Sequence, residues 1–438
     1  MKVLVIGTGY VGLNTGVALA YLGHKVTCLD VDERKIKMLQ DCKAPIYEPH
    51  LDTMLELACP NIQYTTNYDE ADIAITDVVF ISVGTPSLMD GSANLEYVRQ
   101  AAHSVGSRLN DHFTVVVNKS TVPIGSGHWV SAIVRDAYIE SHGHKPDGNY
   151  AIASNPEFLR QGSALADTFY PDRIVVGASD ARAIDVLTNL YRPLLNQDFA
   201  APDCLPRPEG MGAVPVVTCD LASAELIKYA ANSFLALKIS YINEIAALSD
   251  KVGADINQVA RGIGLDSRIG PRFLNPGIGW GGSCFGKDTA ALVATAKEYN
   301  LEMPIVAAAR DVNYRLRDTV VENLQAELKI LKGRTVTLLG LAFKPNTDDL
   351  RDAPSIDIAK KLIQRGAKVR AHDPVAIENM KRQYPELEIE YFQDANEAVS
   401  DCDAVVLVTE WPEYRKLDWK ALKSRIAVLD GRYFLNLG

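Results

Sequence analysis

The stretch with the most chemically suggestive residues runs from Asn275 to Asp288 and reads Asn-Pro-Gly-Ile-Gly-Trp-Gly-Gly-Ser-Cys-Phe-Gly-Lys-Asp. Its four glycines before the cysteine permit backbone conformations closed to other residues and a close approach to a ligand. Cys284 precedes an alanine-rich run, residues 289–299, that predicts a helix, and a helix N-terminus favours a thiolate. Lys287 adds a cation, and Asp288 adds a carboxylate that could move protons. The pattern favours a nucleophilic cysteine, against the alternative of a small buried hydrophobic side chain.

The composition excludes several classes of function. A length of 438 residues suggests two or three domains. The net charge of -10 argues against a nucleic-acid-binding protein, and no apolar run approaches the ~18 residues needed to cross a bilayer. The first residues already predict a strand, so we expect no signal peptide. Seven cysteines without Cys-x-x-Cys spacing indicate a reducing compartment and no metal site. We therefore expect a cytoplasmic protein without nucleic-acid or membrane partners.

The N-terminal residues carry a pattern typical of dinucleotide binding. Residues 2–6 predict a buried strand, Gly7-Thr-Gly9-Tyr-Val-Gly12 follows, and residues 13–22 predict a helix. A second strand, residues 24–29, ends in Asp30, which suits a ribose 2′-OH and repels a 2′-phosphate. We predict NAD rather than NADP, with pyrophosphate at the helix N-terminus, although Lys35 is a cation that could meet a phosphate. A glycine turn without a ligand is the alternative. The predicted cofactor contacts here are Gly7, Gly9, Tyr10, Val11, Gly12, Asp30 and Lys35.

Two further apolar runs end in loops suited to the same ligand. Residues 78–83 run into Gly84-Thr85-Pro86, and residues 114–117 run into a loop that contains Thr121. Because ligands of open α/β sheets lie beyond the carboxyl ends of strands, Thr85 and Thr121 are candidates by position. Ordinary turn chemistry is the alternative explanation for the Thr-Pro pairs.

The remaining part of the first domain is less informative. Residues 151–154 predict a strand that runs into Glu157, a better placed carboxylate than most, since most single carboxylates are solvated. Residues 172–177 are expected to close the sheet. The Pro- and Gly-rich residues 200–215 predict a surface loop at a domain boundary.

A long helix is predicted over residues 221–252, after Asp220 as a plausible N-cap. Some 30 residues span about 45 Å, enough to join two domains. Lys228 and Asn232 are four residues apart and share a face of this helix. That face either meets a ligand or carries a snorkelling lysine beside an ordinary asparagine. The helix and the segment up to about residue 325 predict a central helical region around Cys284.

The C-terminal part repeats the pattern of the first. Residues 334–340, 366–373 and 403–408 parallel residues 2–7, 23–30 and 77–82, so a second doubly wound sheet is predicted. Its first turn, residues 340–344, lacks further glycines, which indicates a different nucleotide-like ligand. Three cations could meet its phosphates, or could be solvated surface charges: Lys344, Arg351 and Arg432.

The predicted fold is α/β, with two doubly wound, Rossmann-like parallel-sheet domains joined by a long central helix and a helical region. We expect an NAD-binding domain over residues 1–215 and a central helical and dimerisation region over residues 216–325, which contains the catalytic cysteine. The ligand-binding domain is expected over residues 326–438.

Several motifs spread along the chain carry a family resemblance. The chain resembles the UDP-glucose/GDP-mannose dehydrogenase family nearly from end to end. The stretches that match begin with residues 7–12, Val83-Gly-Thr-Pro86, Lys119-Ser-Thr-Val-Pro123 and Asn155-Pro-Glu-Phe-Leu-Arg160; they continue with Lys228-Tyr-Ala-Ala-Asn232, Gly279-Trp-Gly-Gly-Ser-Cys-Phe285, Lys287-Asp288 and residues 341–349.

The resemblance implies an NAD-dependent four-electron oxidation of UDP-glucose to UDP-glucuronate. Cys284 would add to an aldehyde intermediate, giving a thiohemiacetal and then a thioester. Lys228 and Asn232 would stabilise the oxyanion, Asp288 with Thr121 would accept the proton, and Glu157 would activate water. The UDP-sugar contacts implied are Glu157, Phe158, Leu159, Lys228, Asn232, Arg268, Asn275, Gly281, Lys344 and Arg432, with Arg268 reaching across a homodimer. The NAD contacts implied include Gly84, Thr85, Pro86, Thr121, Lys287 and Arg351.

The chain departs from the family pattern at a few positions. Many relatives carry a second Glu where this chain has Gln161, so hydrolysis should depend more heavily on Glu157. Gly286 replaces a Pro or another residue and is expected to loosen the turn after Cys284. Within the family, GDP-mannose and UDP-N-acetylhexosamines are the alternative substrates. Outside it, the alternatives are a two-electron hydroxyacid dehydrogenase with a structural cysteine and an inactive NAD-binding sensor.

Overall fold

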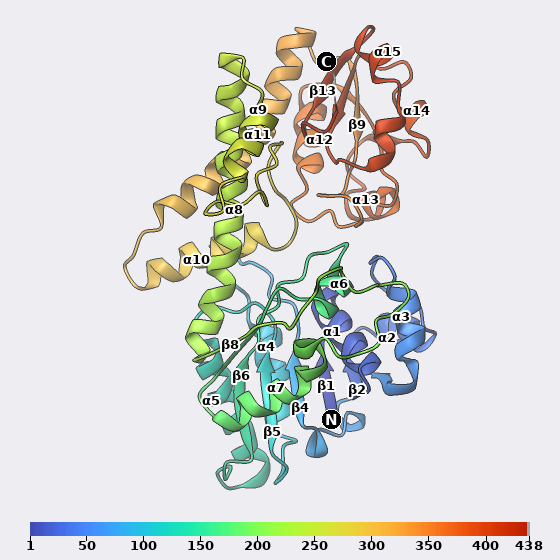
Figure 1. The fold of residues 1–438 in the computed structure, drawn as a ribbon. Coiled ribbons are helices and arrows are strands. Elements are labelled where there is room, and N and C mark those ends of the chain that lie inside the picture. Colours follow the sequence, from blue (N-terminus) through green and yellow to red (C-terminus); the bar gives the residue numbers. More distant parts are fainter. Residues whose placement is uncertain (436–438) are drawn as a thin grey trace. The chain divides into compact units, whose positions relative to one another are not determined.

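The computed structural model describes residues 1–435, and the chain divides into two compact units, Met1–Ala230 and Ala231–Gly438 (Figure 1). The first unit contains an eight-stranded sheet in the order β3-β2-β1-β4-β5-β6-β7-β8. Its strands are β1 (Lys2–Ile6), β2 (Lys25–Leu29), β3 (Ile62–Thr65), β4 (Val78–Ile81), β5 (Thr114–Asn118), β6 (Tyr150–Ser154), β7 (Ile174–Ala178) and β8 (Val216–Cys219). Because the strand order reverses between β1 and β4, ligands are expected beyond the carboxyl ends of these two strands.

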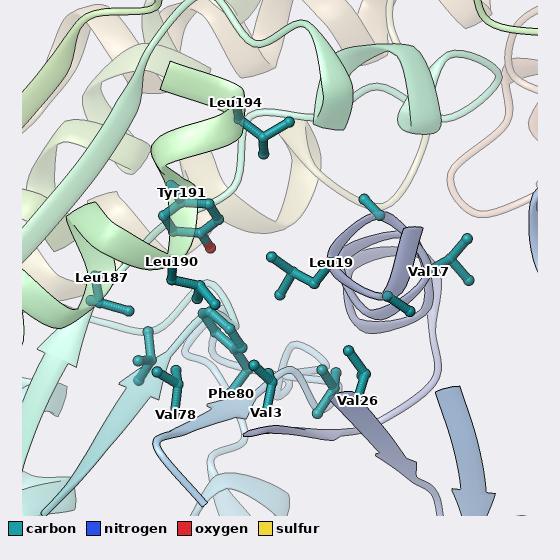
Figure 2. Close-up of a cluster of buried hydrophobic side chains, with 14 of the residues drawn as sticks. Val3, Val17, Leu19, Val26, Val78, Phe80, Leu187, Leu190, Tyr191 and Leu194 are labelled. Atoms are coloured by element: carbon teal, nitrogen blue, oxygen red, sulfur yellow. The ribbon is translucent and has the colours of Figure 1, made fainter. Parts of the chain in front are cut away.

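Helices cover both faces of this sheet. They are α1 (Tyr10–Tyr21), α2 (Glu33–Gln40), α3 (Leu51–Ala58), α4 (Glu96–Gly106), α5 (Ser126–His142), α6 (Ala164–Phe169) and α7 (Ala181–Asn196), with short 3-10 turns η1 (Cys59–Asn61), η2 (Tyr68–Glu70) and η3 (Ile73–Ile75). Alternate residues of β1 enter different cores, since Val3 and Val5 pack with α1 and α7, whereas Leu4 and Ile6 pack with α4 and α5. Figure 2 shows the first core, where Leu19 of α1 and Leu190 of α7 face the strands. The doubly wound fold predicted for this part is confirmed.

The far edge of the sheet differs from the prediction. β7 was expected to close a parallel sheet, but it pairs antiparallel with β6, and β8 lies beyond it as the edge strand. The preceding segment, residues 200–215, was expected to be a surface loop and is instead partly buried. Leu205 and Val214 belong to the core, and the Tyr170 hydroxyl donates to Leu205 O at 2.6 Å. This segment therefore packs on the core and carries the chain to β8 at the edge of the sheet.

The long predicted helix is α8 (Leu221–Val252), 32 residues or about 48 Å in length (Figure 1, green). Asp220 caps it as expected, because its Oδ1 accepts the Ser223 N–H at 2.8 Å. The helix contains no Gly or Pro, which would break it.

The second unit contains a five-stranded parallel sheet in the order β11-β10-β9-β12-β13. Its strands are β9 (Thr335–Leu339), β10 (Lys368–His372), β11 (Ile389–Tyr391), β12 (Ala404–Leu407) and β13 (Ala427–Asp430). Its helices are α9 (Ile256–Gly264), α10 (Phe285–Glu298), α11 (Pro304–Leu328), α12 (Pro354–Gln364), α13 (Ile377–Gln383), α14 (Ala395–Ala398) and α15 (Trp419–Lys423), with the 3-10 turn η4 (Pro412–Lys416). The second doubly wound sheet is therefore confirmed, with its order reversing between β9 and β12.

The first turn of this second sheet is held by an acidic side chain, as the first turn of the first sheet is. Buried Asp373, at the end of β10, accepts the N–H groups of Leu341 and Ala342 at 2.7 and 3.1 Å. It also accepts the indole N–H of Trp411. In the turn after β9, the peptide N–H groups of Leu341 and Ala342 are thus occupied by a carboxylate of the protein itself.

Within the described residues, no helix is long and apolar enough to cross a membrane. The same part of the chain contains no group of three or more His, Cys, Asp or Glu that could hold a metal ion. The division into three functional regions stays a prediction.

Candidate functional site

The glycine turn between β1 and α1 has the geometry of a pyrophosphate cradle. A Cβ on Gly7, whose φ is +98°, would lie 2.7 Å from Ser82 O, and one on Gly12 would lie 1.9 Å from Gly7 O. These two glycines therefore allow the turn to pack tightly. Gly9 is the N-cap of α1, and no described atom lies within 4 Å of the position of its missing Cβ. The N-terminus of α1 is thus open to an anion, which fits the diphosphate of NAD.

Asp30 lies beside this turn and is held in one orientation. Its Oδ2 accepts both the N–H and the hydroxyl of Thr8 at 2.7 Å, and its Oδ1 accepts Asp32 N at 3.0 Å. Burial favours the neutral acid, but these hydrogen bonds and Lys35, 3.7 Å away, outweigh it and lower the pKa of Asp30. An ionised Asp30 suits a ribose hydroxyl and disfavours a 2′-phosphate. Lys35 is paired with Asp30, which weakens the case for a phosphate-binding role.

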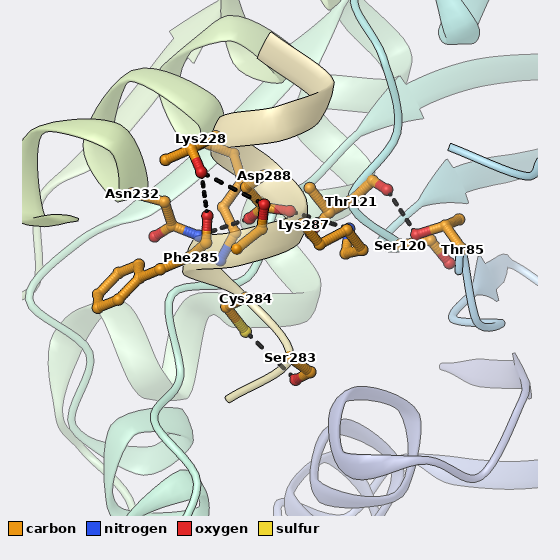
Figure 3. A network of polar contacts seen from close by, with 12 residues as sticks. Thr85, Ser120, Thr121, Lys228, Asn232, Ser283, Cys284, Phe285, Lys287 and Asp288 are labelled. Carbon is orange, nitrogen blue, oxygen red and sulfur yellow. Dashed lines mark hydrogen bonds and ion pairs between the residues drawn. The ribbon is translucent and has the colours of Figure 1, made fainter. Parts of the chain in front are cut away.

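The two threonine loops predicted from strand ends lie next to each other. The Thr85 hydroxyl, beyond β4, donates to Thr121 O, beyond β5, at 2.9 Å (Figure 3). Ser120 fixes the same pair of loops by donating to Val83 O at 2.7 Å. β4 and β5 are neighbouring parallel strands, so the loops after them emerge at one edge of the sheet.

Glu157 and Lys228 form a buried ion pair. The Lys228 ammonium lies 3.0 Å from Glu157 Oε1 and donates to Glu157 O at 2.6 Å. The other carboxylate oxygen accepts Leu159 N at 2.8 Å. The Phe158 ring lies against cations, with the Arg173 guanidinium 3.7 Å and the Lys228 ammonium 5.4 Å from its centroid. The structure thus brings together four residues that the sequence assigned to the substrate: Glu157, Phe158, Leu159 and Lys228.

A second buried lysine in the same unit received no role from the sequence. Lys119 donates to Asn155 Oδ1 at 2.9 Å, and the same oxygen accepts the Tyr191 hydroxyl at 2.6 Å. Burial lowers the pKa of Lys119 to about 8; Glu157 raises it and Lys228 lowers it further. The signal that could have found Lys119 is a cation placed directly after a wholly buried strand.

Glu225, also missed from the sequence, ties the first turns of α8 to α5. Its carboxylate accepts Gly125 N at 2.6 Å and Gly127 N at 2.8 Å, at the N-terminus of α5. A Cβ on Gly127 would lie 3.2 Å from Glu225 Oε1, so a side chain there would crowd the carboxylate. Burial raises the pKa of Glu225 to about 7; the two N–H groups oppose the shift, and Asp220 adds to it.

This shift makes stability depend on pH. In the unfolded chain a Glu titrates near pH 4.3, so between about pH 4.3 and 7 the folded protein binds a proton that the unfolded chain has released. The stability that this proton contributes is therefore lost as pH rises through 7. We expect the free energy of unfolding of Glu225→Gln, relative to the wild type, to increase from pH 5 to pH 7.5.

Urea unfolding at several pH values measures this difference. Glu244→Gln, an exposed position on the same helix, is the matched control and should follow the wild-type curve. Parallel pH profiles for wild type and Glu225→Gln would contradict the expectation.

In the second unit, Asn232, Asp288 and Lys287 form one polar cluster. The Asn232 amide donates to Asp288 Oδ2 at 2.6 Å, and the Lys287 ammonium lies 2.9 Å from Asp288 Oδ1 (Figure 3). Asp288 is 1 % exposed and lies in the first turn of α10. Both oxygens of this buried carboxylate are therefore engaged, one by a cation and one by an amide donor.

Cys284 is the N-cap residue of α10 and is exposed. Its carbonyl accepts Asp288 N at 2.8 Å, and its sulfur lies 3.7 Å from the Ser283 hydroxyl (Figure 3). The helix begins at Phe285, earlier than predicted, which places the sulfur directly at the positive end of the helix dipole. Both exposure and helix N-terminal position are features of reactive cysteines.

Only some of the positions predicted to contact the nucleotide lie near one another. Arg432 donates to Val408 O at 2.7 Å and to Gly279 O at 3.0 Å, so it joins the end of β12 to the glycine loop. Gly281 is buried, and its Cβ would lie 2.4 Å from Asp352 O. Lys344 and Arg351 lie in one loop, and the Arg351 guanidinium forms an ion pair with Asp349 at 2.7 Å.

Two other predicted contacts lie on the surface. Asn275 is exposed at the start of the glycine loop. Arg268 is exposed and pairs with Asp266 at 2.6 Å; none of its described partners is another predicted site residue.

The structure clarifies the two departures from the family pattern. Gln161 is buried. The N–H of the next residue, Gly162, donates to Glu48 at 2.8 Å, so Glu48 holds the loop that carries Glu157. Gly286 lies in the first turn of α10, and the loosening expected there stays a prediction. The Gly286 carbonyl accepts from Arg310 at 2.6 Å, and a Cβ there would lie 3.0 Å from Asp352 Oδ2, so glycine makes room for a neighbouring loop.

Family models cover most of the chain. Residues 1–195 match the NAD binding domain of the UDP-glucose/GDP-mannose dehydrogenase family, residues 222–315 its central domain, and residues 337–436 its UDP binding domain.

Individual relatives agree with the family models. The chain is 43% identical over 440 residues to UDP-glucose 6-dehydrogenase TuaD of Bacillus subtilis, covering 100% of this chain and 90% of that protein. It is 45% identical over 431 residues to UDP-glucose 6-dehydrogenase of Rhizobium meliloti, covering 97% and 92%. The structure of a UDP-glucose dehydrogenase from Pyrobaculum islandicum is 39% identical, with a TM-score of 0.89 over 100% of this chain and 95% of that one. The chain is therefore an NAD-dependent oxidoreductase that belongs to the UDP-glucose/GDP-mannose dehydrogenase family.

Proposed function

We propose that the protein oxidises UDP-glucose to UDP-glucuronate, with Cys284 as the covalent nucleophile. The carrying observation is the exposed Cys284 sulfur at the N-cap of α10, with the buried Asp288 carboxylate one turn later. The names of the relatives described above support UDP-glucose as the sugar nucleotide. NAD, when bound, accepts one hydride in each of two oxidations.

In the first oxidation, the C6 hydroxyl loses a hydride and a proton and becomes an aldehyde. Asp288, together with Thr121, is proposed to receive the proton. Asp288 is suited to this role because Asn232 and Lys287 hold its two oxygens at 2.6 and 2.9 Å.

In the second stage, the Cys284 thiolate adds to the aldehyde carbon and forms a C–S bond. The oxyanion that develops needs preorganised donors, and Lys228 and Asn232, one turn apart on α8, are proposed to supply them. Loss of a second hydride leaves a thioester on the sulfur. An aldehyde carbon gives up a hydride readily only after a nucleophile has made it tetrahedral, which is the chemical reason for a covalent step.

Hydrolysis of the thioester requires an activated water, and Glu157 is proposed to take its proton. The Lys228 ammonium lies 3.0 Å from Glu157 Oε1, so a cation is held beside the carboxylate that acts as base. Gln161 can orient the water but cannot accept its proton. Of Glu157 and Gln161, only Glu157 can therefore accept the proton at this step.

For NAD we propose the backbone of residues 7–12 and 84–86, the side chains of Asp30, Lys35 and Thr121, and contacts from Lys287 and Arg351. For the UDP-sugar we propose Phe158, Leu159, Asn275, Gly281, Lys344 and Arg432, with Arg268 contributed by a neighbouring subunit.

Parallel assays with UDP-glucose, GDP-mannose and UDP-N-acetylhexosamines test the substrate. We expect kcat/KM for UDP-glucose to exceed the others by at least 100-fold, with UDP-glucuronate identified by mass spectrometry. A higher kcat/KM for GDP-mannose or a UDP-N-acetylhexosamine would replace UDP-glucose within the family. A product other than a uronate would contradict the proposal as a whole. The cytoplasmic location expected from the cysteine pattern is part of the same proposal.

We also propose a homodimer that uses an apolar stripe on α8. Phe234, Tyr241 and Leu248 follow one another at seven-residue spacing, so they lie on one face, and they are 61%, 52% and 59% exposed. Large exposed apolar side chains in a continuous row mark a surface that another protein covers. A second copy can present the same stripe, as in a two-fold symmetric interface.

Glutamate at Tyr241 should convert the dimer to monomers, because a carboxylate would be buried without a partner. Sedimentation velocity of Tyr241→Glu at micromolar concentration measures this, and Leu57→Glu, at an exposed position of α3, is the control. A dimeric Tyr241→Glu would contradict the use of this stripe.

A further inference from the structure

One side chain of α11 holds the backbone of the glycine loop that leads to Cys284. Asn313 is fully buried, its Oδ1 accepts Trp280 N at 2.7 Å, and its Nδ2 donates to Trp280 O at 3.0 Å. Because one amide satisfies both the donor and the acceptor of a single residue, its orientation is fixed: rotating the amide by 180° would lose both bonds.

The residue before Trp280, Gly279, leaves room for the Asn313 side chain. Gly279 has φ of +93°, and a Cβ at this position would lie 2.5 Å from Asn313 Oδ1. Trp280 itself is buried, and its ring meets the ring of Phe285 edge to face at 6.0 Å. Asn313 thus holds the loop on one side of Cys284, and the Trp280 ring contacts the residue on the other side.

Other residues on the same face of α11 reinforce the hold. Arg310 and Arg317 lie three and four residues from Asn313 and so share its face. Arg310 donates to Gly286 O at 2.6 Å, and Arg317, 2% exposed, donates to Trp280 O at 3.2 Å. The Arg317 charge is compensated by Asp352 at 2.8 Å. α11 therefore contacts the chain before and after Cys284.

The segment between Trp280 and Cys284 is Gly281-Gly282-Ser283, which has little conformational preference of its own. We propose that Asn313 is a positioning residue that sets the approach of the Cys284 sulfur to the aldehyde carbon. It touches no reacting atom and acts through the Trp280 backbone. The inference rests on the proposed function, because it concerns the capture step of that reaction.

Asn313→Leu, which keeps the branched shape and the number of heavy atoms but has no polar atoms, is the direct test, and Asn313→Ser is a milder second variant. We expect kcat per folded molecule to fall at least tenfold with KM for NAD changed less than twofold. The ratio of NADH formed to UDP-glucose consumed should fall from two toward one, with free aldehyde detected by mass spectrometry. This ratio does not depend on the fraction of folded enzyme, so loss of stability alone does not change it.

Asn323→Leu, at an exposed position of the same helix, is the matched control and should keep the wild-type ratio. A second readout is independent of the reaction: the rate of Cys284 alkylation by iodoacetamide, mapped by mass spectrometry, should change at least threefold in the Asn313 variants. A ratio of two and an unchanged alkylation rate in both Asn313 variants would overturn the inference. A ratio of one in the wild type would instead overturn the proposed function, and the alkylation rates would still decide the role of Asn313.

Discussion

Replacing Cys284 with serine is expected to lower the rate of UDP-glucuronate formation by at least about 10³-fold, equivalent to about 4 kcal/mol of activation free energy. A serine hydroxyl has a far higher pKa than a thiol, so the helix N-terminus that favours a thiolate cannot produce a comparable alkoxide. The first oxidation does not need the sulfur. The variant should therefore still form NADH slowly and release aldehyde, which steady-state and single-turnover kinetics would separate.

The other exposed cysteine offers a matched control. Cys59 lies in the 3-10 turn η1, outside every predicted contact, and Cys59→Ser should keep wild-type turnover. Undiminished UDP-glucuronate formation by Cys284→Ser would remove this residue from the mechanism.

Replacing Lys228 with methionine is expected to affect both stability and rate. The variant leaves Glu157 buried without its cation, and breaking a buried ion pair on one side costs about 3–5 kcal/mol of folding free energy. The loss of an oxyanion donor should also lower kcat by about 10²–10³-fold. Urea unfolding and kinetics below the unfolding temperature measure the two effects, and Lys251→Met, at an exposed position of α8, is the control.

A double variant separates the two roles of Lys228. Removing the charge from both partners in Lys228→Met with Glu157→Gln should restore most of the lost stability, because no uncompensated charge remains. Activity should stay low, since neither the oxyanion donor nor the base is present. A stable Lys228→Met single variant would contradict the importance of the ion pair, and an active double variant would contradict both catalytic assignments.

Much of the fold follows from local sequence. The apolar strand, glycine turn and helix of residues 2–22, the second strand that ends before Asp30 and the long helix with its Asp220 cap were all predicted from spacing and residue type. The second sheet followed from its likeness to the first. These features depend on residues close in sequence, where periodicity and turn chemistry carry the information.

The features that were missed depend on residues far apart in the chain. β7 pairs antiparallel with β6, and β8 forms the edge of the sheet after residues 200–215, which pack on the core. Composition alone assigned those residues to the surface. Glu225 meets Gly125 and Gly127 about 100 positions earlier, and no local pattern announces such a contact.

The same limit applies inside the candidate site. The sequence named Lys228 and Glu157 but gave them separate roles, whereas the structure joins them in one ion pair. Asn313 reads as one more polar residue in a helix, and only the fold shows that it meets both backbone groups of Trp280. Burial turns ordinary polar residues into positioning groups, and burial at these places is decided by tertiary contacts.

The central claim, that the Cys284 sulfur captures the oxidised C6 carbon, is tested most directly by trapping the thioester. Glu157→Gln should form the thioester but hydrolyse it slowly, because the amide accepts a hydrogen bond from Lys228 but takes no proton from water. After mixing with UDP-glucose and NAD, peptide mass spectrometry should find the UDP-glucuronyl group on the peptide that contains Cys284. Turnover to two NADH per UDP-glucose with that peptide unmodified, or with the adduct on another residue, would contradict the account.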